Sequence, residues 1–124
     1  MGVIFDTSKI IDMERSRQEV EELVRGRENE PFGISVVTVA ELLHGVERAD
    51  SEDRKINRQA FVEKVMEIFP IFGFDVAVAR IYARIWASLA KRNLIVGAHD
   101  LIIAATAISL NYTVITSNIR DVAV

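Results

Sequence analysis

The sequence predicts an α/β domain in which a short parallel sheet lies between helices on both of its faces. Short apolar runs alternate along the chain with longer segments of helical spacing, as is typical of sheets with helical crossovers. The runs are short and largely apolar without strict alternation, as expected for strands buried on both sides. The length of 124 residues predicts one domain, residues 1–124, whose core needs no disulfide or structural metal.

The first half of the chain contains two predicted strands and three predicted helices. The expected order is a strand over 3–5, a helix over 16–27, a loop at Pro31 and Gly33, a strand over 34–38 and helices over 39–46 and 61–69. Gly26 and Pro70 stop two of the helices, and Thr38 is placed to cap the helix that follows it. The charged residues 50–57 are expected to form a loop and a solvated helix start.

The second half continues the alternation. The expected order is a strand over 71–75, a helix over 76–92, a loop over 93–98, a helix over 101–110 and a strand over 113–116. The helix over 101–110 is almost entirely apolar, which predicts a central and buried position. Lys91 and Arg92 fall in the last turn of the preceding helix, where the helix dipole favours cations.

The composition excludes several classes of site. The chain has no cysteine, so it has no disulfide framework, thiolate zinc site or cysteine nucleophile. Its net charge of −3 leaves no general basic footprint for nucleic acid. The N-terminus does not resemble a signal peptide, and no apolar stretch is long enough to span a bilayer. We therefore expect a cytoplasmic protein that does not enter a membrane.

Four carboxylates fall near the same edge of the predicted sheet. Asp6 ends the first strand, Glu41 lies early in the helix after the second, Asp100 opens the apolar helix and Asp121 follows the last strand. Ligands of open parallel sheets bind outside the carboxyl ends of the strands. Each acid alone could be a helix cap, a helix-dipole partner or a solvated loop residue, but independent caps need not gather at one edge.

Clustered carboxylates repel one another, and they persist most easily when cations neutralise them. Hard oxygen ligands without cysteine or a histidine pair favour Mg²⁺ or Mn²⁺. Such ions commonly serve phosphoryl chemistry, in which no protein nucleophile is needed. The acids therefore predict a metal site suited to phosphoryl chemistry.

Four blocks of sequence resemble the PIN-domain ribonucleases, and among them the VapC-type toxins of toxin–antitoxin pairs. The blocks are IFDTS (4–8), ISVVTVAELLHGVE (34–47), GAHDLIIAATA (97–107) and VITSNIRD (114–121). They occur in the family order and cover essentially the whole chain. The resemblance implies a three-layer PIN-like fold and an endoribonuclease that cleaves RNA with Mg²⁺ or Mn²⁺. Toxins of this type usually form homodimers, and the tail of a cognate antitoxin occupies the active-site groove.

The resemblance also implies roles for individual residues. Asp6, Glu41 and Asp100 match the three core metal-binding acids, and Asp121 matches a fourth, more variable one. The polar residues that match positions lining or bracing the site are Thr7, Ser8, Thr116 and Asn118.

Several other residues have two possible roles. Arg120 and Lys9 lie beside the predicted site and could hold an RNA phosphate. His99, next to Asp100, is expected to be a plain loop residue, with a contact to substrate as the alternative. Trp86 is expected in the core or at a dimer interface. The cations of the helix over 76–92 are expected to be ordinary surface charges, with a basic rim as the alternative; they are Arg80, Arg84, Lys91 and Arg92.

Two other functions compete with the nuclease. A receiver-like or haloacid-dehalogenase-like phosphotransfer domain also uses an aspartate at the end of a parallel strand. However, Ser8 stands where a second aspartate would follow Asp6, and no lysine follows the last strand. A non-catalytic PIN-like module that binds RNA or protein would not need all the acids that are present here.

Overall fold

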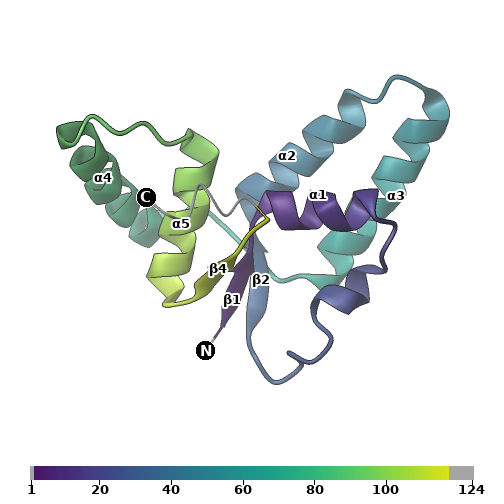
Figure 1. The fold of residues 1–124 in the computed structure, drawn as a ribbon, viewed down its shortest axis with the longest axis horizontal. Coiled ribbons are helices and arrows are strands. Elements are labelled where there is room, and N and C mark those ends of the chain that lie inside the picture. Colours follow the sequence, from purple (N-terminus) through teal and green to yellow (C-terminus); the bar gives the residue numbers. More distant parts are fainter. Residues whose placement is uncertain (1, 118–124) are drawn as a thin grey trace.

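Four short parallel strands form the centre of the protein, in the order β3-β2-β1-β4 (Figure 1). The computed structural model describes residues 2–117. The strands are β1 (Val3–Phe5), β2 (Phe32–Ser35), β3 (Ile71–Phe72) and β4 (Thr113–Ile115). The helices are α1 (Thr7–Arg15), the short 3₁₀ helix η1 (Val20–Leu23), α2 (Val36–Glu47), α3 (Glu52–Ile68), α4 (Val76–Lys91) and α5 (Ala98–Leu110).

The prediction of a parallel sheet with helices on both faces is confirmed. Val3 and Phe5 pack into a core with α1, α2 and α3, whereas Ile4 points to the other face, where it packs against α5. Figure 1 shows α4 and α5 on one side of the sheet and α1 and α3 on the other, and α4 packs mainly against α5. Because successive side chains of a strand point to opposite faces, both faces of β1 are apolar.

The larger core is organised around one aromatic ring. Phe69 follows the end of α3 and makes edge-on contacts with Phe5 of β1 and Phe32 of β2, each with ring centroids 5.6 Å apart. Its side chain is buried. These contacts join the C-terminal end of α3 to β1 and β2.

The predicted helix over 16–27 is wrong. The first helix is α1, which begins directly after Asp6 and ends at Arg15. Arg17 has a left-handed φ of 57°, which ordinary helix residues avoid, and only the single turn η1 follows. Val20 and Leu23 are three residues apart, a spacing that suits a 3₁₀ turn as well as an α-helix.

The second strand and its helix begin earlier than predicted. The strand is Phe32–Ser35, and α2 starts at Val36. Ser35, and not Thr38, caps the helix, because its Oγ accepts a hydrogen bond of 3.1 Å from the backbone N–H of Val37. Gly33 lies inside the strand, where a Cβ would collide with the ring of Phe72 and lie 2.7 Å from the carbonyl oxygen of Pro70. Glycine therefore allows close approach of β3.

Two boundaries in the second half also differ from the prediction. The third strand is only Ile71–Phe72, because Asp75 caps α4 by accepting a hydrogen bond of 2.9 Å from the N–H of Val78. Helix α5 begins at Ala98, with Gly97 at its N-cap, so Asp100 lies in the first turn. Within the described part of the chain, none of the helices combines the length and apolar character needed to span a bilayer.

Phe69→Ala should lower the free energy of unfolding by about 3–5 kcal/mol, because it removes a buried ring and leaves a cavity. Urea unfolding followed by circular dichroism measures the change. Phe74→Ala is the matched control: Phe74 is exposed and contacts one aromatic ring, that of Tyr82, so its loss should cost about 1 kcal/mol. Equal losses in the two variants would contradict this account of the core.

Candidate metal centre

The site residues meet where parallel strands reach the same edge of the sheet. Asp6 follows β1 and occupies the N-cap position of α1, and its backbone N–H donates a 2.8 Å bond to the carbonyl of Ile115 in β4. Helix α2 starts from the same end of β2. Helix α5 leads into β4 through a tight connection and runs back along the sheet, so its N-terminal end also lies at this edge (Figure 1).

The carboxylate of Asp6 is buried and held by hydroxyl groups. Its side chain is 8% exposed. Its Oδ2 accepts hydrogen bonds from Ser8 Oγ at 2.6 Å and from Thr116 Oγ1 at 2.8 Å. The two hydroxyl oxygens are 3.0 Å apart, and Ser8 Oγ accepts a further bond from the N–H of Ser117. These donors orient the carboxylate but bring no positive charge to balance it.

Glu41 is joined to the same region through Thr7. Its Oε1 accepts a 2.8 Å hydrogen bond from Thr7 Oγ1, which lies 2.9 Å from Thr38 Oγ1. A hydroxyl has only one hydrogen. If Thr7 donates to Glu41, Thr38 must donate to Thr7. The fully buried Thr38 therefore orients Thr7, which in turn holds Glu41.

Asp100 lies on the opposite side of the site, in the first turn of α5, and its side chain is exposed. Its neighbour His99 places Nδ1 3.7 Å from Glu41 Oε2. The N-terminal end of α5 therefore lies close to Glu41 of α2. A chain of contacts and sequence neighbours runs from Asp6 through Thr7 to Glu41 and on to His99 and Asp100.

These residues do not form a closed metal cage. Among residues 2–117, no three histidine, cysteine or acidic side chains are grouped closely enough to hold an ion. The structure thus brings Asp6 and Glu41 together through Thr7 but does not gather Asp100 with them into one ligand set. The oxygen donors still fit Mg²⁺ or Mn²⁺, since such ions usually keep several waters and bind one or two carboxylates together with substrate phosphates.

The remaining predicted site residues have different outcomes. Thr7, Ser8 and Thr116 lie at the site and bond to its acids. Lys9 is partly buried in the first turn of α1. The other three lie outside the described residues, and they are Asn118, Arg120 and Asp121.

Two contacts of the site were not predicted from the sequence. Thr38 was assigned to a helix cap, but its hydroxyl bonds to Thr7 inside the protein. The spacing of three between Thr38 and Glu41 places both on one side of α2, and this was the available signal. His99 was expected to be a plain loop residue, whereas its ring lies beside Glu41. No local pattern predicts that contact, because it depends on how α5 packs.

The chain is similar to known proteins both in sequence and in backbone structure. The PIN domain family model matches residues 3–122. A protein named ribonuclease VapC1 from Rickettsia felis is 39% identical over 98% of this chain and 88% of its own length. A structure of DNA-bound VapBC from Salmonella typhimurium aligns with a TM-score of 0.87 and 26% identity, covering 100% of this chain and 92% of that one. VapBC-5 from Mycobacterium tuberculosis, a member of the VapBC family of toxin–antitoxin systems, has a TM-score of 0.74 and 32% identity over 94% of this chain and 85% of its own.

Thr38 and Glu41 both form hydrogen bonds with Thr7. We therefore expect the stability effects of replacing Thr38 and Glu41 to be coupled. In a double-mutant cycle of Thr38→Val and Glu41→Gln, the free energies of unfolding should depart from additivity by at least about 0.5 kcal/mol. Thr38→Val alone should cost about 1 kcal/mol. Urea denaturation gives all three values.

Thr106→Val provides the control for this cycle. Thr106 is equally buried, but its hydroxyl bonds to the carbonyl of Ile102 in its own helix. We expect its effect and that of Glu41→Gln to be additive. Additivity for Thr38 as well would show that the hydroxyl chain does not hold Glu41.

Proposed function

This chain belongs to the PIN-domain family, and we propose that it is a metal-dependent endoribonuclease acting as the toxin of a toxin–antitoxin pair. One observation supports the proposal most strongly: a buried Asp6, held by neutral hydroxyls, lies beside a Thr7 that holds Glu41. Two oriented carboxylates whose hydrogen-bond donors within residues 2–117 are neutral hydroxyls suit a hard dication. The sequence identity to a protein named ribonuclease VapC1 supports RNA as the substrate.

We propose Asp6, Glu41 and Asp100 as the residues that would hold Mg²⁺ or Mn²⁺, with Asp121 as a fourth. A bound dication supplies Lewis-acid polarisation of a phosphate and acidifies water. Ser8 and Thr116 fix the direction of the Asp6 carboxylate, and Thr7 fixes that of Glu41. Oriented ligands need no reorganisation as negative charge develops on the phosphate.

The remaining polar residues receive supporting roles in this proposal. Lys9 follows Ser8 at the start of α1, where its cation can attract an RNA phosphate. Arg120 is assigned the same role, and Asn118 is assigned to bracing the site, from their places in the fourth sequence block. A phosphate bound near two carboxylates needs such cations, because like charges repel strongly outside bulk water.

The alternative functions make different predictions. A phosphotransfer domain is disfavoured, because it would need an acid where Ser8 bonds to Asp6. A non-catalytic module has no need of a site that accepts a dication. Titration with Mn²⁺ therefore separates the nuclease from a pure binding module.

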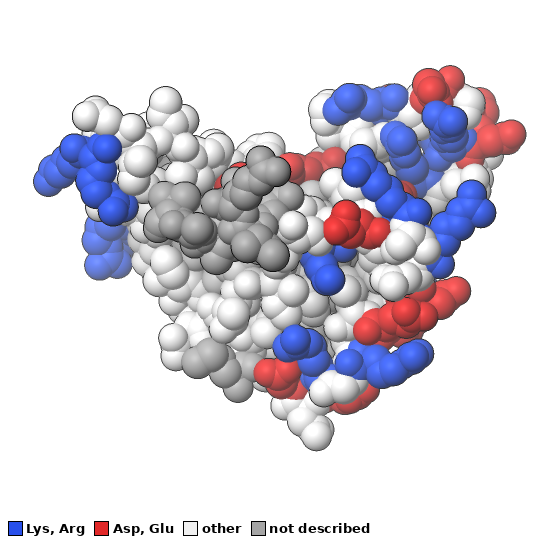
Figure 2. Space-filling model, in the orientation of Figure 1, with Lys and Arg blue, Asp and Glu red and all other residues white. Residues whose placement is uncertain are grey.

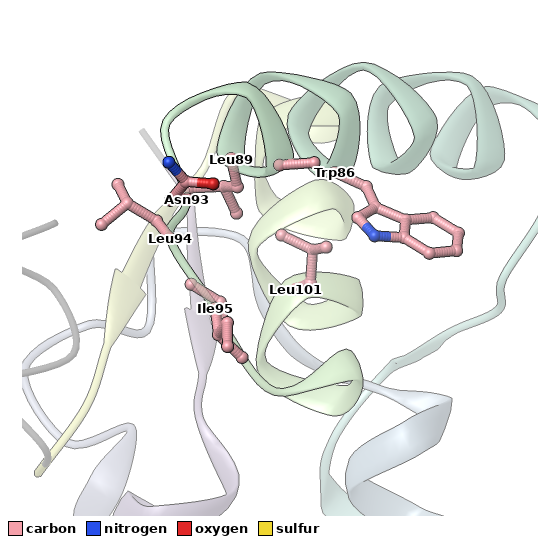
Figure 3. A pocket seen from close by; sticks show the side chains of 8 residues that line it. Trp86, Leu89, Asn93, Leu94, Ile95 and Leu101 are labelled. Carbon is pink, nitrogen blue, oxygen red and sulfur yellow. The ribbon is translucent and has the colours of Figure 1, made fainter.

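We also propose two protein partners. The membership of the Mycobacterium tuberculosis relative in a toxin–antitoxin family supports a cognate antitoxin for this chain. A second copy of the chain is supported by an exposed apolar surface at the end of α4. There Trp86 is 61% exposed and Ile95 is 99% exposed, around a hollow of about 440 Å³ that Leu89, Leu94 and Leu101 also line (Figure 3). Apolar surface of this kind on a soluble chain usually marks an interface.

Asp6→Asn should reduce RNA cleavage in Mg²⁺ or Mn²⁺ by roughly 100-fold or more, since replacing even an outer-shell partner of a metal site typically costs 10- to 100-fold. Gel assays with purified protein freed of antitoxin measure the rate. Asp12→Asn, an exposed position on the same helix, should cut normally. Cleavage that persists in a chelator, or that survives Asp6→Asn, would contradict the proposed site.

Replacing the exposed apolar residues should weaken self-association. The double variant Trp86→Ser/Ile95→Ser should raise the dissociation constant of the dimer by roughly thirtyfold or more, because a buried interface tryptophan is commonly worth about 2 kcal/mol. Analytical ultracentrifugation gives the constant. The control Ile56→Ser removes an exposed isoleucine on α3 and should leave the dimer intact. A wild-type chain that stays monomeric at high concentration would exclude the dimer.

A further inference from the structure

Helix α4 carries an unusual charge distribution. Residues 76–99 contain four arginine or lysine residues and no aspartate or glutamate, in a chain whose net charge is −3. All four cations are exposed. Figure 2 shows Lys and Arg side chains on the flank where Figure 1 places α4, without acidic side chains among them in this view.

Three of these cations form a line on one side of the helix. Arg80, Arg84 and Lys91 lie at spacings of four and seven residues, which at about 100° per residue places them within roughly 40° of one another. We refer to these three residues as the α4 cationic stripe. The buried Val78 and Leu89 lie about 160–180° around the helix from Arg80. The stripe therefore faces away from the protein.

Within residues 2–117, no ion pair involves a charge of the stripe. The ion pairs of the described residues involve Arg27, Arg54, Lys55, Lys64 and His99, and none includes a cation of α4. The dipole of α4 explains a cation at Lys91, in the last turn, but not at Arg80, which lies in the second turn. The stripe is thus available to an external anion.

The dimensions and side chains of the stripe suit a polyanion. It extends about 16 Å, at 1.5 Å per residue, the length of roughly five nucleotides of a strand at 3.4 Å each. The position between Arg84 and Lys91 on this side is Ala87, which leaves no large apolar side chain on the line. Protein interfaces usually depend on a buried aromatic or aliphatic anchor, so the stripe favours phosphates over a protein partner.

From these observations we infer that the α4 cationic stripe is a second RNA-binding surface, which holds backbone phosphates away from the cleavage site. The inference rests on the proposed function, since it assumes RNA as the substrate. Helix α4 packs against α5 on the far side from β4 and is the outermost layer (Figure 1). Only an RNA that extends beyond the candidate metal centre can reach the stripe.

The stripe remains accessible in the proposed dimer. Trp86 lies about 120° around the helix from Arg80 and about 160° from Arg84. A second copy that covers Trp86 and Ile95 therefore approaches from a different direction.

The test measures binding of a 30-nucleotide RNA to protein carrying Asp6→Asn, which prevents cutting. Adding R80Q/R84Q/K91Q should weaken binding at least tenfold in 0.1 M salt. The slope of log affinity against log salt should fall in magnitude by about 2, since each single-strand phosphate contact contributes about 0.7. The matched control is R54Q/K55Q/K64Q, which removes three cations of α3 that pair with acids in the protein; it should change the slope by less than 0.7.

The outcomes separate the two proposals. Equal slopes for the α4 and α3 variants, or no change for either, would overturn the inference. The inference would also be overturned if R80Q/R84Q/K91Q abolished self-association, measured by ultracentrifugation, and left RNA binding unchanged. If R80Q/R84Q/K91Q lowers the melting temperature, R84Q alone should still reduce the slope by about 0.7. Cleavage that survives Asp6→Asn would refute the metal centre. RNA binding does not depend on catalysis, so the stripe would still be tested by the change in salt slope that R80Q/R84Q/K91Q causes.

Discussion

The parallel pairing of β1 with both of its neighbours is the constraint on which the site depends. Val3 and Ile4 align with Phe32 and Gly33 of β2 on one side, and the same strand aligns residue by residue with β4 on the other. The bond from the Asp6 N–H to Ile115 extends this pairing by one residue. A shift of one residue would exchange the two faces of β1, and it would move the Asp6 carboxylate away from Thr116.

This pairing also explains why the site can be built from hydroxyl groups. Parallel strands bring Ser8 to Thr116 and Thr7 to Thr38 at one edge, and each pair joins segments that are distant in sequence. Neutral donors hold the buried Asp6 carboxylate and the half-buried Glu41 carboxylate without neutralising them, whereas an arginine or lysine at the same place would form a closed ion pair. The arrangement keeps negative charge at the edge of the sheet, where a dication and a phosphate can share it.

The sequence predicts the elements of the fold better than it predicts the contacts of the site. The central strand and its terminal aspartate follow from one apolar run and one polar residue. Helix α1 was missed, because Thr7 and Ser8 read as a turn while their side chains in fact bond across the site. Thr38 was assigned to a helix cap. Its spacing from Glu41 indicated that it lies on the side of α2 that carries the acid, but its partner Thr7 depends on the packing of α1 against α2. The apolar periodicity of a segment predicts which of its side chains are buried, but it does not predict which hydroxyl bonds to which carboxylate.

Because charges of opposite sign lie in different parts of the molecule, the net charge alone does not indicate whether a surface can bind nucleic acid. A net charge of −3 argues against nucleic-acid binding only if the charges are evenly mixed. Here three cations of α3 pair with acids, while α4 presents cations without acids on its outer side. Phosphates respond to the local field within about a Debye length of 8–10 Å, not to the sum over the chain. The acidic centre proposed to bind a dication and a separate basic flank are therefore compatible features of one protein.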